Sequence, residues 1–324
     1  MEINPRDYCI FIASHMSKSQ RIPYLTECIT SLVHQTLKIP IYLSISFDNV
    51  DIENETKMQL QQHSEKYKYD FLNIRYRSEK TPQMQHFNLL IKEFSGKHNW
   101  IMFCDDDDTY EPNRTVHIAQ LLTISKQQMS NQDEVSLGGV YESTFNKHHR
   151  EHRHEYWCYC VSEKMIIDFM KVVEKYEDAL YDKCCDVLFA EYLRRKSNTC
   201  IFLQMPVKYY NYRVEDNSDS ITGYIRQNQS KYTLKSKPPD WASETWSEYV
   251  FGWDEYVYEN MPIFLHDTYL RTIIGNDLQT ILKSEFLENF AILPYVNKNH
   301  EEKIKKKYNY LRQLCNELYD LKLD

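Results

Sequence analysis

The chain has 324 residues and a formal net charge of −8, from 39 Lys and Arg residues against 47 Asp and Glu residues. That balance repels phosphate backbones, so the composition argues against a nucleic-acid partner. Only six glycines occur, and the sequence contains neither G-x-G-x-x-G nor G-K-[ST]. The dinucleotide-binding fingerprint and the Walker-type phosphate loop are therefore both excluded.

The cellular compartment is predicted from the cysteines and from the lack of long apolar stretches. Nine cysteines, an odd number, lie without the regular spacing of a disulfide framework, which favours reduced thiols. The apolar run at residues 8–13 is too short for a secretion signal. Nothing approaches the roughly 20 apolar residues of a membrane span. We therefore expect a cytoplasmic protein without a transmembrane segment.

The first 105 residues alternate between strand-like and helix-like segments. Short apolar runs that end in polar side chains are typical of buried parallel strands. Such runs lie at residues 8–13, 39–47 and 100–104, with a third strand-like segment at 71–76 and helix-like segments at 23–37 and 82–94. This order predicts an α/β protein with a doubly wound sheet, in which ligands bind at the carboxyl ends of the strands.

The rest of the chain has a less regular pattern. Strand-like stretches cover 135–141, 155–161 and 200–212, helix-like stretches cover 162–176 and 186–195, and a polar, turn-rich segment covers 213–245. We expect one domain over residues 1–224 and a mainly helical region over 225–324. In the last predicted helix, Ile304, Leu311 and Leu318 recur at heptad spacing, a pattern that would permit a homodimer.

Four consecutive aspartates, Asp105 to Asp108, directly follow the fourth predicted strand. Adjacent carboxylates repel one another and raise each other's pKa values unless a cation neutralises them. A hard divalent ion, held by one or two of these carboxylates and by a substrate phosphate, is the simplest explanation for the cluster. The alternative is a solvated acidic turn that caps the next helix.

Three motifs that occur in a characteristic order give the chain a family resemblance. Residues 24–36 read Y-L-T-E-C-I-T-S-L-V-H-Q-T, residues 105–112 match D-x-D-D-x-x-x-P, and residues 212–220 read Y-R-V-E-D-N-S-D-S. Over about residues 8–220 the chain resembles the family 2 nucleotide-sugar glycosyltransferases. The resemblance implies a GT-A-type fold, a Rossmann-like doubly wound mixed sheet, here with a mainly helical C-terminal extension.

The resemblance also implies the reaction and its cofactor. Such an enzyme moves a sugar from a nucleotide-diphosphate donor, here with a UDP-sugar favoured, to a hydroxyl of a glycan or other acceptor, with inversion. A bound Mn²⁺ or Mg²⁺ ion offsets the charge on the departing nucleoside diphosphate. By resemblance, Asp107 and Asp105 are the metal ligands. The candidate nucleotide-binding residues are Ser14, His15, Asp48, Gln83, Asp105 and Asp106, with Gln85 and Asn88 as further polar candidates. Ordinary caps and loop polarity are the alternative for Ser14, His15, Asp48, Gln83, Gln85 and Asn88.

The acceptor hydroxyl must lose a proton during transfer, so the reaction needs a base. The family places an aspartate at the start of a helix after the metal site, and Asp186 occupies that place here. Asp186 is therefore the candidate catalytic base. A plain helix N-cap is the structural alternative, because aspartate favours that position. Asp178 and Asp182 are the other candidates.

Two other functions fit parts of the sequence. A haloacid-dehalogenase-type phosphatase would use a D-x-D-x-T motif, matched by Asp105, Asp107 and Thr109, with Asp105 as the nucleophile. A non-catalytic protein on a degenerate GT-A scaffold would fit the altered first loop, where A-S-H-M replaces the family's P-T-Y-N. We interpret three further features as structural: a solvated histidine-rich loop at 148–154, a solvated lysine-rich helix face at 303–307 and an aromatic packing segment at 241–258.

Overall fold

The computed structural model describes residues 3–68, 71–129, 136–142, 155–182, 184–213, 261, 264–282 and 298–319. The chain divides into two compact units, Met1–Arg213 and Val214–Asp324. The boundary expected near residue 224, the histidine-rich loop at 148–154 and the aromatic segment at 241–258 all lie outside the described residues. Among the helices that are described, none is long and apolar enough to cross a membrane.

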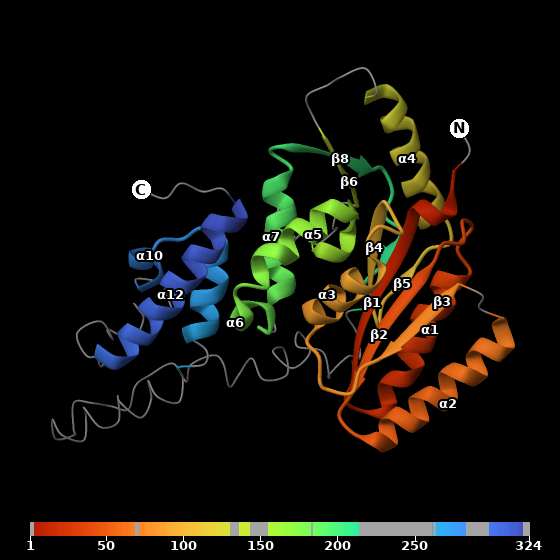
Figure 1. The fold of residues 1–324 in the computed structure, drawn as a ribbon, viewed down its shortest axis with the longest axis horizontal. Helices are drawn as coiled ribbons and strands as arrows, with labels where there is room; N and C mark the ends of the chain where they lie inside the picture. Colours follow the sequence, from red (N-terminus) through yellow and green to blue (C-terminus); the bar gives the residue numbers. More distant parts are fainter. Residues whose placement is uncertain are drawn as a thin grey trace. The chain divides into compact units, whose positions relative to one another are not determined.

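A seven-stranded sheet organises the first unit (Figure 1). Its strands are β1 (Tyr8–Met16), β2 (Ile41–Phe47), β3 (Leu72–Tyr76), β4 (Trp100–Asp105), β6 (Ser136–Glu142), β7 (Tyr159–Ser162) and β8 (Cys200–Met205). They lie in the order β3-β2-β1-β4-β7-β6-β8. β1 to β4 are mutually parallel, and β7 alone in this sheet runs antiparallel to its neighbours. The carboxyl ends of the four parallel strands therefore meet at one edge, together with the amino end of β7.

A second, two-stranded sheet pairs β5 (Thr109–Tyr110) with β9 (Tyr210–Asn211). The helices of the first unit are α1 (Ile22–Val33), α2 (Val50–Tyr67), α3 (Gln83–Phe94), α4 (Arg114–Met129), α5 (Glu163–Val173), α6 (Glu177–Leu180) and α7 (Cys185–Lys196). Figure 1 shows α3, α5 and α7 on one side of the sheet, with α1 and α2 on the other. The sheet is thus covered on both faces, as its nearly all-apolar central strands require.

The packing of α1 explains part of the motif at residues 24–36. Leu25, Cys28 and Leu32 are all fully buried, and their spacing of three and four residues places them on one helix face. α3 ends where the sequence predicts, because Gly96 adopts a φ of +78°. Glycine tolerates this left-handed conformation and commonly ends helices for that reason.

The prediction of an α/β protein with a doubly wound sheet is confirmed. All four strands and both helices predicted before residue 105 are present within a few residues of their expected bounds. The stretch at 155–161 differs, because it begins as a short 3₁₀ helix, Tyr156–Cys158, before β7. The stretch at 200–212 divides into β8 and β9. Three helices of the first unit, α2, α4 and the short α6, were not predicted from the sequence.

In the second unit, the described helices include α10 (Leu278–Leu282) and α12 (Lys298–Tyr319). The heptad residues Ile304, Leu311 and Leu318 of α12 are already buried within the chain. The homodimer stays a prediction, but this stripe is not an exposed surface for it. Lys303, Lys305 and Lys306 are exposed, as expected for a solvated helix face.

Candidate functional site

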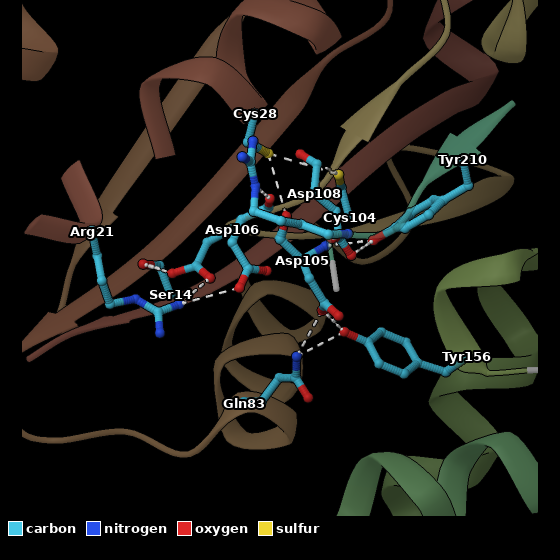
Figure 2. A network of polar contacts seen from close by, with 12 residues as sticks. Ser14, Arg21, Cys28, Gln83, Cys104, Asp105, Asp106, Asp108, Tyr156 and Tyr210 are labelled. Carbon is cyan, nitrogen blue, oxygen red and sulfur yellow. Dashed lines mark hydrogen bonds and ion pairs between the residues drawn. The ribbon is translucent and has the colours of Figure 1, made fainter. Parts of the chain in front are cut away.

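The four aspartates form a tight turn at the carboxyl end of β4. The backbone N–H of Asp108 donates to the carbonyl of Asp105 at 3.2 Å, which closes the turn. Asp105 pairs with Ala13 in the register of β4 against β1, so the next residue of β1, Ser14, reaches the turn (Figure 2). The turn therefore lies at the edge of the sheet where doubly wound proteins bind ligands.

Polar residues of the motif at 24–36 hold the chain that follows this turn. Ser31 Oγ accepts a hydrogen bond from the backbone N–H of Tyr110 at 3.1 Å. Gln35 Nε2 donates to the carbonyl of Glu111 at 2.9 Å, and its Oε1 accepts from the N–H of Thr115 at 3.2 Å. The motif thus has a physical role: its apolar residues pack α1, and its polar residues anchor the exit of the turn.

Asp105 points toward α3 and the segment before β7. Its Oδ1 accepts hydrogen bonds from Gln83 Nε2, at 2.9 Å, and from the Tyr156 hydroxyl, and Gln83 also donates to Tyr156 at 2.7 Å (Figure 2). Burial, followed by the charges of Asp108 and Asp107, raises the pKa of Asp105 well above its usual value. Its neutralisation by a proton or a cation would relieve that repulsion.

Asp106 and Asp107 share one arginine. Arg21 Nη2 lies 2.8 Å from Asp106 Oδ1 and 3.9 Å from Asp107 Oδ2. Ser14 Oγ donates to Asp106 Oδ2 at 2.6 Å. Burial and the charge of Asp106 raise the pKa of Asp107 to about 6, although the charge of Arg21 opposes the rise. One guanidinium group therefore compensates this pair of carboxylates only in part.

Asp108 is fully buried and ties the turn to β9. Its Oδ1 accepts from the backbone N–H of Arg213 at 2.7 Å, and its Oδ2 accepts from the Tyr210 hydroxyl at 2.7 Å. The Tyr210 oxygen in turn accepts from the N–H of Asp105 at 3.0 Å. Burial raises the pKa of Asp108 to about 7, although the hydrogen bond from Arg213 opposes the rise. Both oxygens of Asp108 thus have protein partners, so its role in the structure is to hold the turn.

The turn offers ligands for part of a divalent-ion site but not for a complete one. Among the described residues, no three His, Cys, Asp or Glu side chains gather as a ready metal-binding group. A cage made only of protein ligands is therefore absent from that part of the chain. However, within the described ranges, Arg21 pairs with the carboxylates of this turn, Arg213 contacts its backbone and also pairs with Glu27, and three of the four aspartates have raised pKa values. This donor set suits a hard cation that takes one or two carboxylates and completes its shell with phosphate and water.

The expected nucleotide residues of β1 and β2 lie together. His15 Nδ1 lies 2.9 Å from Ser46 Oγ, and His15 Nε2 lies 2.8 Å from Asp48 Oδ1. Burial lowers the pKa of His15, although its hydrogen bond to Asp48 opposes this. Lys80 Nζ also reaches Asp48 Oδ1, at 3.2 Å. The structure therefore brings the half-buried His15 and the exposed Asp48 together beside the aspartate turn.

The further polar candidates on α3 point elsewhere. Asn88 Nδ2 donates to Gln85 Oε1 at 3.1 Å and to Glu174 Oε1 at 2.9 Å. Glu174 follows α5, so these two side chains join α3 to α5. Of the three α3 candidates, only Gln83 contacts an aspartate of the turn.

Asp186 lies in the first turn of α7, and the N-cap of that helix is Cys184. The N-cap alternative for Asp186 is therefore wrong. The carboxylate of Asp182 accepts from the N–H of Cys184 at 2.9 Å, so that fallback candidate has a structural role at the start of the helix. Asp178, the other fallback, is exposed in α6.

Asp186 acts electrostatically on the site. Burial raises the pKa of Tyr156 well above its usual value, and the charges of Asp105 and Asp186 raise it further. Tyr156 packs against Phe103 and Phe189, with ring centroids 5.6 Å and 6.4 Å apart, and this cluster joins β4 to α7. Asp186 is thus placed on the same side of the turn as Tyr156.

Three residues at the turn were missed from sequence: Arg21, Tyr156 and Tyr210. They lie 85, 51 and 105 positions away from the aspartates they contact, so no local spacing points to them. The third motif does include Arg213, whose Nε donates to the carbonyl of Asp107 at 2.8 Å. That segment was the one available signal that the end of the first unit reaches the turn.

Similarity to solved structures is broad but low. Staphylococcus aureus TarS is 12% identical (TM-score 0.40), and the match covers 96% of this chain and 55% of TarS, so this chain spans about half that protein's length. A mannosyltransferase from Pyrobaculum calidifontis, solved with GDP-Man and Mn²⁺, is 12% identical (TM-score 0.44), with 96% of this chain and 87% of that chain covered. The 4-diphosphocytidyl-2C-methyl-D-erythritol synthase of Anaerococcus prevotii is 17% identical (TM-score 0.37), with 69% and 98% covered.

Sequence comparison gives a more definite result than these structures. No curated protein matches the chain significantly. The profile of the family described as "Glycosyl transferase family 2" matches residues 9–194, which is more than half of the chain. The match runs from within β1 to within α7 and includes the aspartate turn and Asp186. The resemblance inferred from the three motifs is confirmed, and the chain belongs to glycosyl transferase family 2.

Proposed function

We propose that the protein is a metal-dependent glycosyltransferase that moves a sugar from a nucleotide-diphosphate donor to an acceptor hydroxyl, with inversion. The observation that carries the proposal is the position of the aspartate turn, which lies at the carboxyl end of β4 beside Ser14 of β1. An excess of buried carboxylates at this edge of the sheet suits a site for a cation and a phosphorylated ligand.

We assign the donor to the residues at the ends of β1, β2 and β4. His15 and Asp48 offer polar groups to the nucleoside, which we expect to be uridine. Asp107, with Asp105 as the second candidate, would hold Mn²⁺ or Mg²⁺. When bound, the ion supplies positive charge that offsets the negative charge on the departing diphosphate. Asp106 and Asp108 are bonded to Ser14 and Tyr210, which supports a role in holding the shape of the turn.

We assign the acceptor side to α7. Asp186, in its first turn, would accept the proton of the acceptor hydroxyl, and a helix N-terminus favours a carboxylate there. The acceptor is a glycan or another hydroxyl compound. All nine cysteines lie among the described residues and are free thiols, which supports the proposed cytoplasmic location.

The first test is calorimetric binding of UDP, GDP and CDP, each with and without Mn²⁺. Wild type should bind one of them, with UDP favoured, and only when Mn²⁺ is present. Asp107→Asn keeps the side-chain volume but removes the charge, so it should lose this metal-dependent binding. The matched control is Asp168→Asn, which removes a surface carboxylate that pairs with Lys164 on α5. It should bind as wild type does. A folded wild type that binds none of the three nucleotides would contradict the proposal.

The second test addresses the base. Asp186→Asn should lower kcat at least a hundredfold, because general-base catalysis contributes about 10²–10⁴-fold, while nucleotide affinity stays within about twofold. Turnover is measured as release of the nucleoside diphosphate from the sugar donor that the first test selects. Asp178→Asn is the control and should keep wild-type turnover. Equal rates for Asp186→Asn and wild type would remove Asp186 from the mechanism.

The two alternative functions predict different outcomes in the same assays. The family match gives no support to the phosphatase, which would hydrolyse a phosphate monoester such as p-nitrophenyl phosphate through Asp105. A non-catalytic scaffold would show neither hydrolysis nor metal-dependent nucleotide binding.

A further inference from the structure

The side chain of Arg21 contacts the aspartate turn at the edge of the sheet. It ends a short 3₁₀ helix, Ser19–Arg21, and precedes α1, so its side chain starts from the loop that follows β1. From there its guanidinium group reaches Asp106 at 2.8 Å (Figure 2). It also lies 3.9 Å from Asp107. The side chain is only 14% exposed. A cation is thus already present at the carboxylates that the proposed function assigns to the metal and its support.

The same guanidinium group also lies near the nucleotide end of the site. It shares Asp106 with Ser14, and the residue after Ser14, His15, contacts Asp48 at the end of β2. Arg21 therefore lies near both parts of the proposed donor site. His15 and Asp48 are assigned to the nucleoside, and Asp107 is assigned to the metal. In a nucleoside diphosphate bound in this way, the two phosphates would extend from the nucleoside to the metal.

We propose that Arg21 binds the donor diphosphate, and that before the donor binds it acts as a substitute cation for Asp106 and Asp107. This inference rests on the proposed function and adds a residue to it. Arginine suits the exchange, because its planar fork of N–H donors can serve either a carboxylate pair or a phosphate group. The bond to Asp106 is short and the contact with Asp107 is long, so the contact with Asp107 is the weaker one and is released first.

The exchange makes Arg21 act in opposite directions on two ligands. Without nucleotide, its charge near Asp107 repels an incoming divalent ion and weakens binding of the metal alone. With nucleotide, the same charge attracts the diphosphate and strengthens its binding. A residue that only supports the fold would weaken both ligands or neither.

The test measures three dissociation constants for wild type, Arg21→Gln and Arg21→Lys: for Mn²⁺ alone, for UDP in saturating Mn²⁺ and for uridine in saturating Mn²⁺. GDP or CDP with its nucleoside replaces the uridine pair if wild type prefers it. For Arg21→Gln we expect UDP to bind at least about tenfold more weakly. Uridine should stay within about twofold, and Mn²⁺ alone should bind severalfold more tightly. Arg21→Lys keeps the charge but loses the fork, so UDP should weaken by about threefold or more with uridine unchanged.

Arg75→Gln is the matched control, because Arg75 pairs with a carboxylate, Glu93, on the outer face of α3. It should match wild type for all three ligands. If Arg21→Gln does not fold, Arg21→Lys decides the question by the ratio of UDP to uridine affinity. An unchanged ratio in the folded variants overturns the inference. If Asp107→Asn still loses metal-dependent UDP binding, that result leaves the proposed function standing. A wild type that binds no nucleoside diphosphate overturns both.

Discussion

Two groups of buried charges in the first unit are balanced in different ways. Arg114, at the start of α4, and Glu142, at the end of β6, are 0% and 1% exposed and form an ion pair. Glu142 Oε2 also accepts the backbone N–H groups of Tyr209 and Tyr210 at 2.8 and 3.0 Å. One positive charge thus meets one negative charge, and the remaining carboxylate oxygen is satisfied by the backbone.

The aspartate turn contains four carboxylates, and among the described residues the arginine that pairs with them is Arg21, while Arg213 contacts the backbone of the turn. The raised pKa values of Asp105, Asp107 and Asp108 show that ionisation of this group is unfavourable in the protein alone. Tyr210 connects the two groups, because Glu142 holds its backbone and its hydroxyl contacts Asp108. The balanced pair fixes the position of Tyr210 and hence of the turn, whereas the uncompensated carboxylates of the unbalanced turn are what the proposed cation would neutralise.

The largest expected effect is the loss of the balanced pair. Glu142→Gln keeps the shape of the side chain but leaves the buried charge of Arg114 without its counter-ion. Removal of one partner of a buried pair costs about 3–5 kcal/mol, so the free energy of unfolding should fall by that amount in urea titrations. Glu93→Gln is the control, since Glu93 forms partly exposed pairs with Arg75 and Arg77. The free energy of unfolding of Glu93→Gln should fall by less than about 1 kcal/mol. Equal losses in the free energy of unfolding would show that the buried pair of Arg114 and Glu142 contributes no more to stability than the partly exposed pairs of Glu93.

A buried histidine makes the first unit sensitive to acid. His86 is buried between Ser44 and Ser46 on β2, with ring nitrogens 2.8 and 3.2 Å from their hydroxyls. Burial, with the charge of Arg77, lowers the pKa of His86 to about 3. Between this value and about 6.5 only the unfolded chain binds the proton, so stability falls as the pH falls through that window. The loss should be roughly 1 kcal/mol for each pH unit.

The aspartates act in the opposite direction. The pKa values of Asp107 and Asp108 are raised in the folded protein, so protonation below about pH 7 stabilises it. His86→Gln should therefore make the metal-free protein less sensitive to acid between pH 6.5 and 4.5, as measured by urea unfolding in EDTA. An unchanged pH profile in this variant would mean that the acid sensitivity arises at another group.

The smallest effect is expected at the unbalanced turn itself. Asp107→Asn removes one repelling charge, so at pH 7.5 the metal-free variant should be as stable as wild type or up to about 1 kcal/mol more stable. Thermal unfolding with and without Mn²⁺ checks this result. The ion should raise the Tm of wild type, because it binds only the folded state, and should leave the Tm of Asp107→Asn unchanged. A clear loss of stability in metal-free Asp107→Asn would show that the turn is balanced after all.

The fold was predictable where apolar patterns are strong. β1, β2 and β4 are largely apolar runs, and α1 and α3 bury broad apolar stripes. α2 was missed because only Ile52, Thr56 and Leu60 are buried among its 18 residues, which is too weak a stripe to separate from a loop. The reversed direction of β7 was also hidden, since an apolar run looks the same in either direction.

The sequence predicted where the candidate site lies in the fold, but it did not predict most of the contacts within the site. Asp105 to Asp108 follow a strand, so the edge of the sheet at which they lie could be derived. The direction of each carboxylate depends on the turn and on partners far away in the chain. Arg21 and Tyr156 became part of the site only through the sheet order, which places β1 and β7 on either side of β4.

The reversed strand β7 has a consequence for how such a protein can diversify. Parallel strands contribute the residues that follow them, such as Asp48 after β2. β7 contributes the residues that precede it, because its amino end lies at the same edge, and Tyr156 is one of these. The two sides of the site are therefore encoded by separate stretches of the chain, before residue 109 and after residue 154. Mutation and recombination can alter the residues on one side while the other side is inherited unchanged.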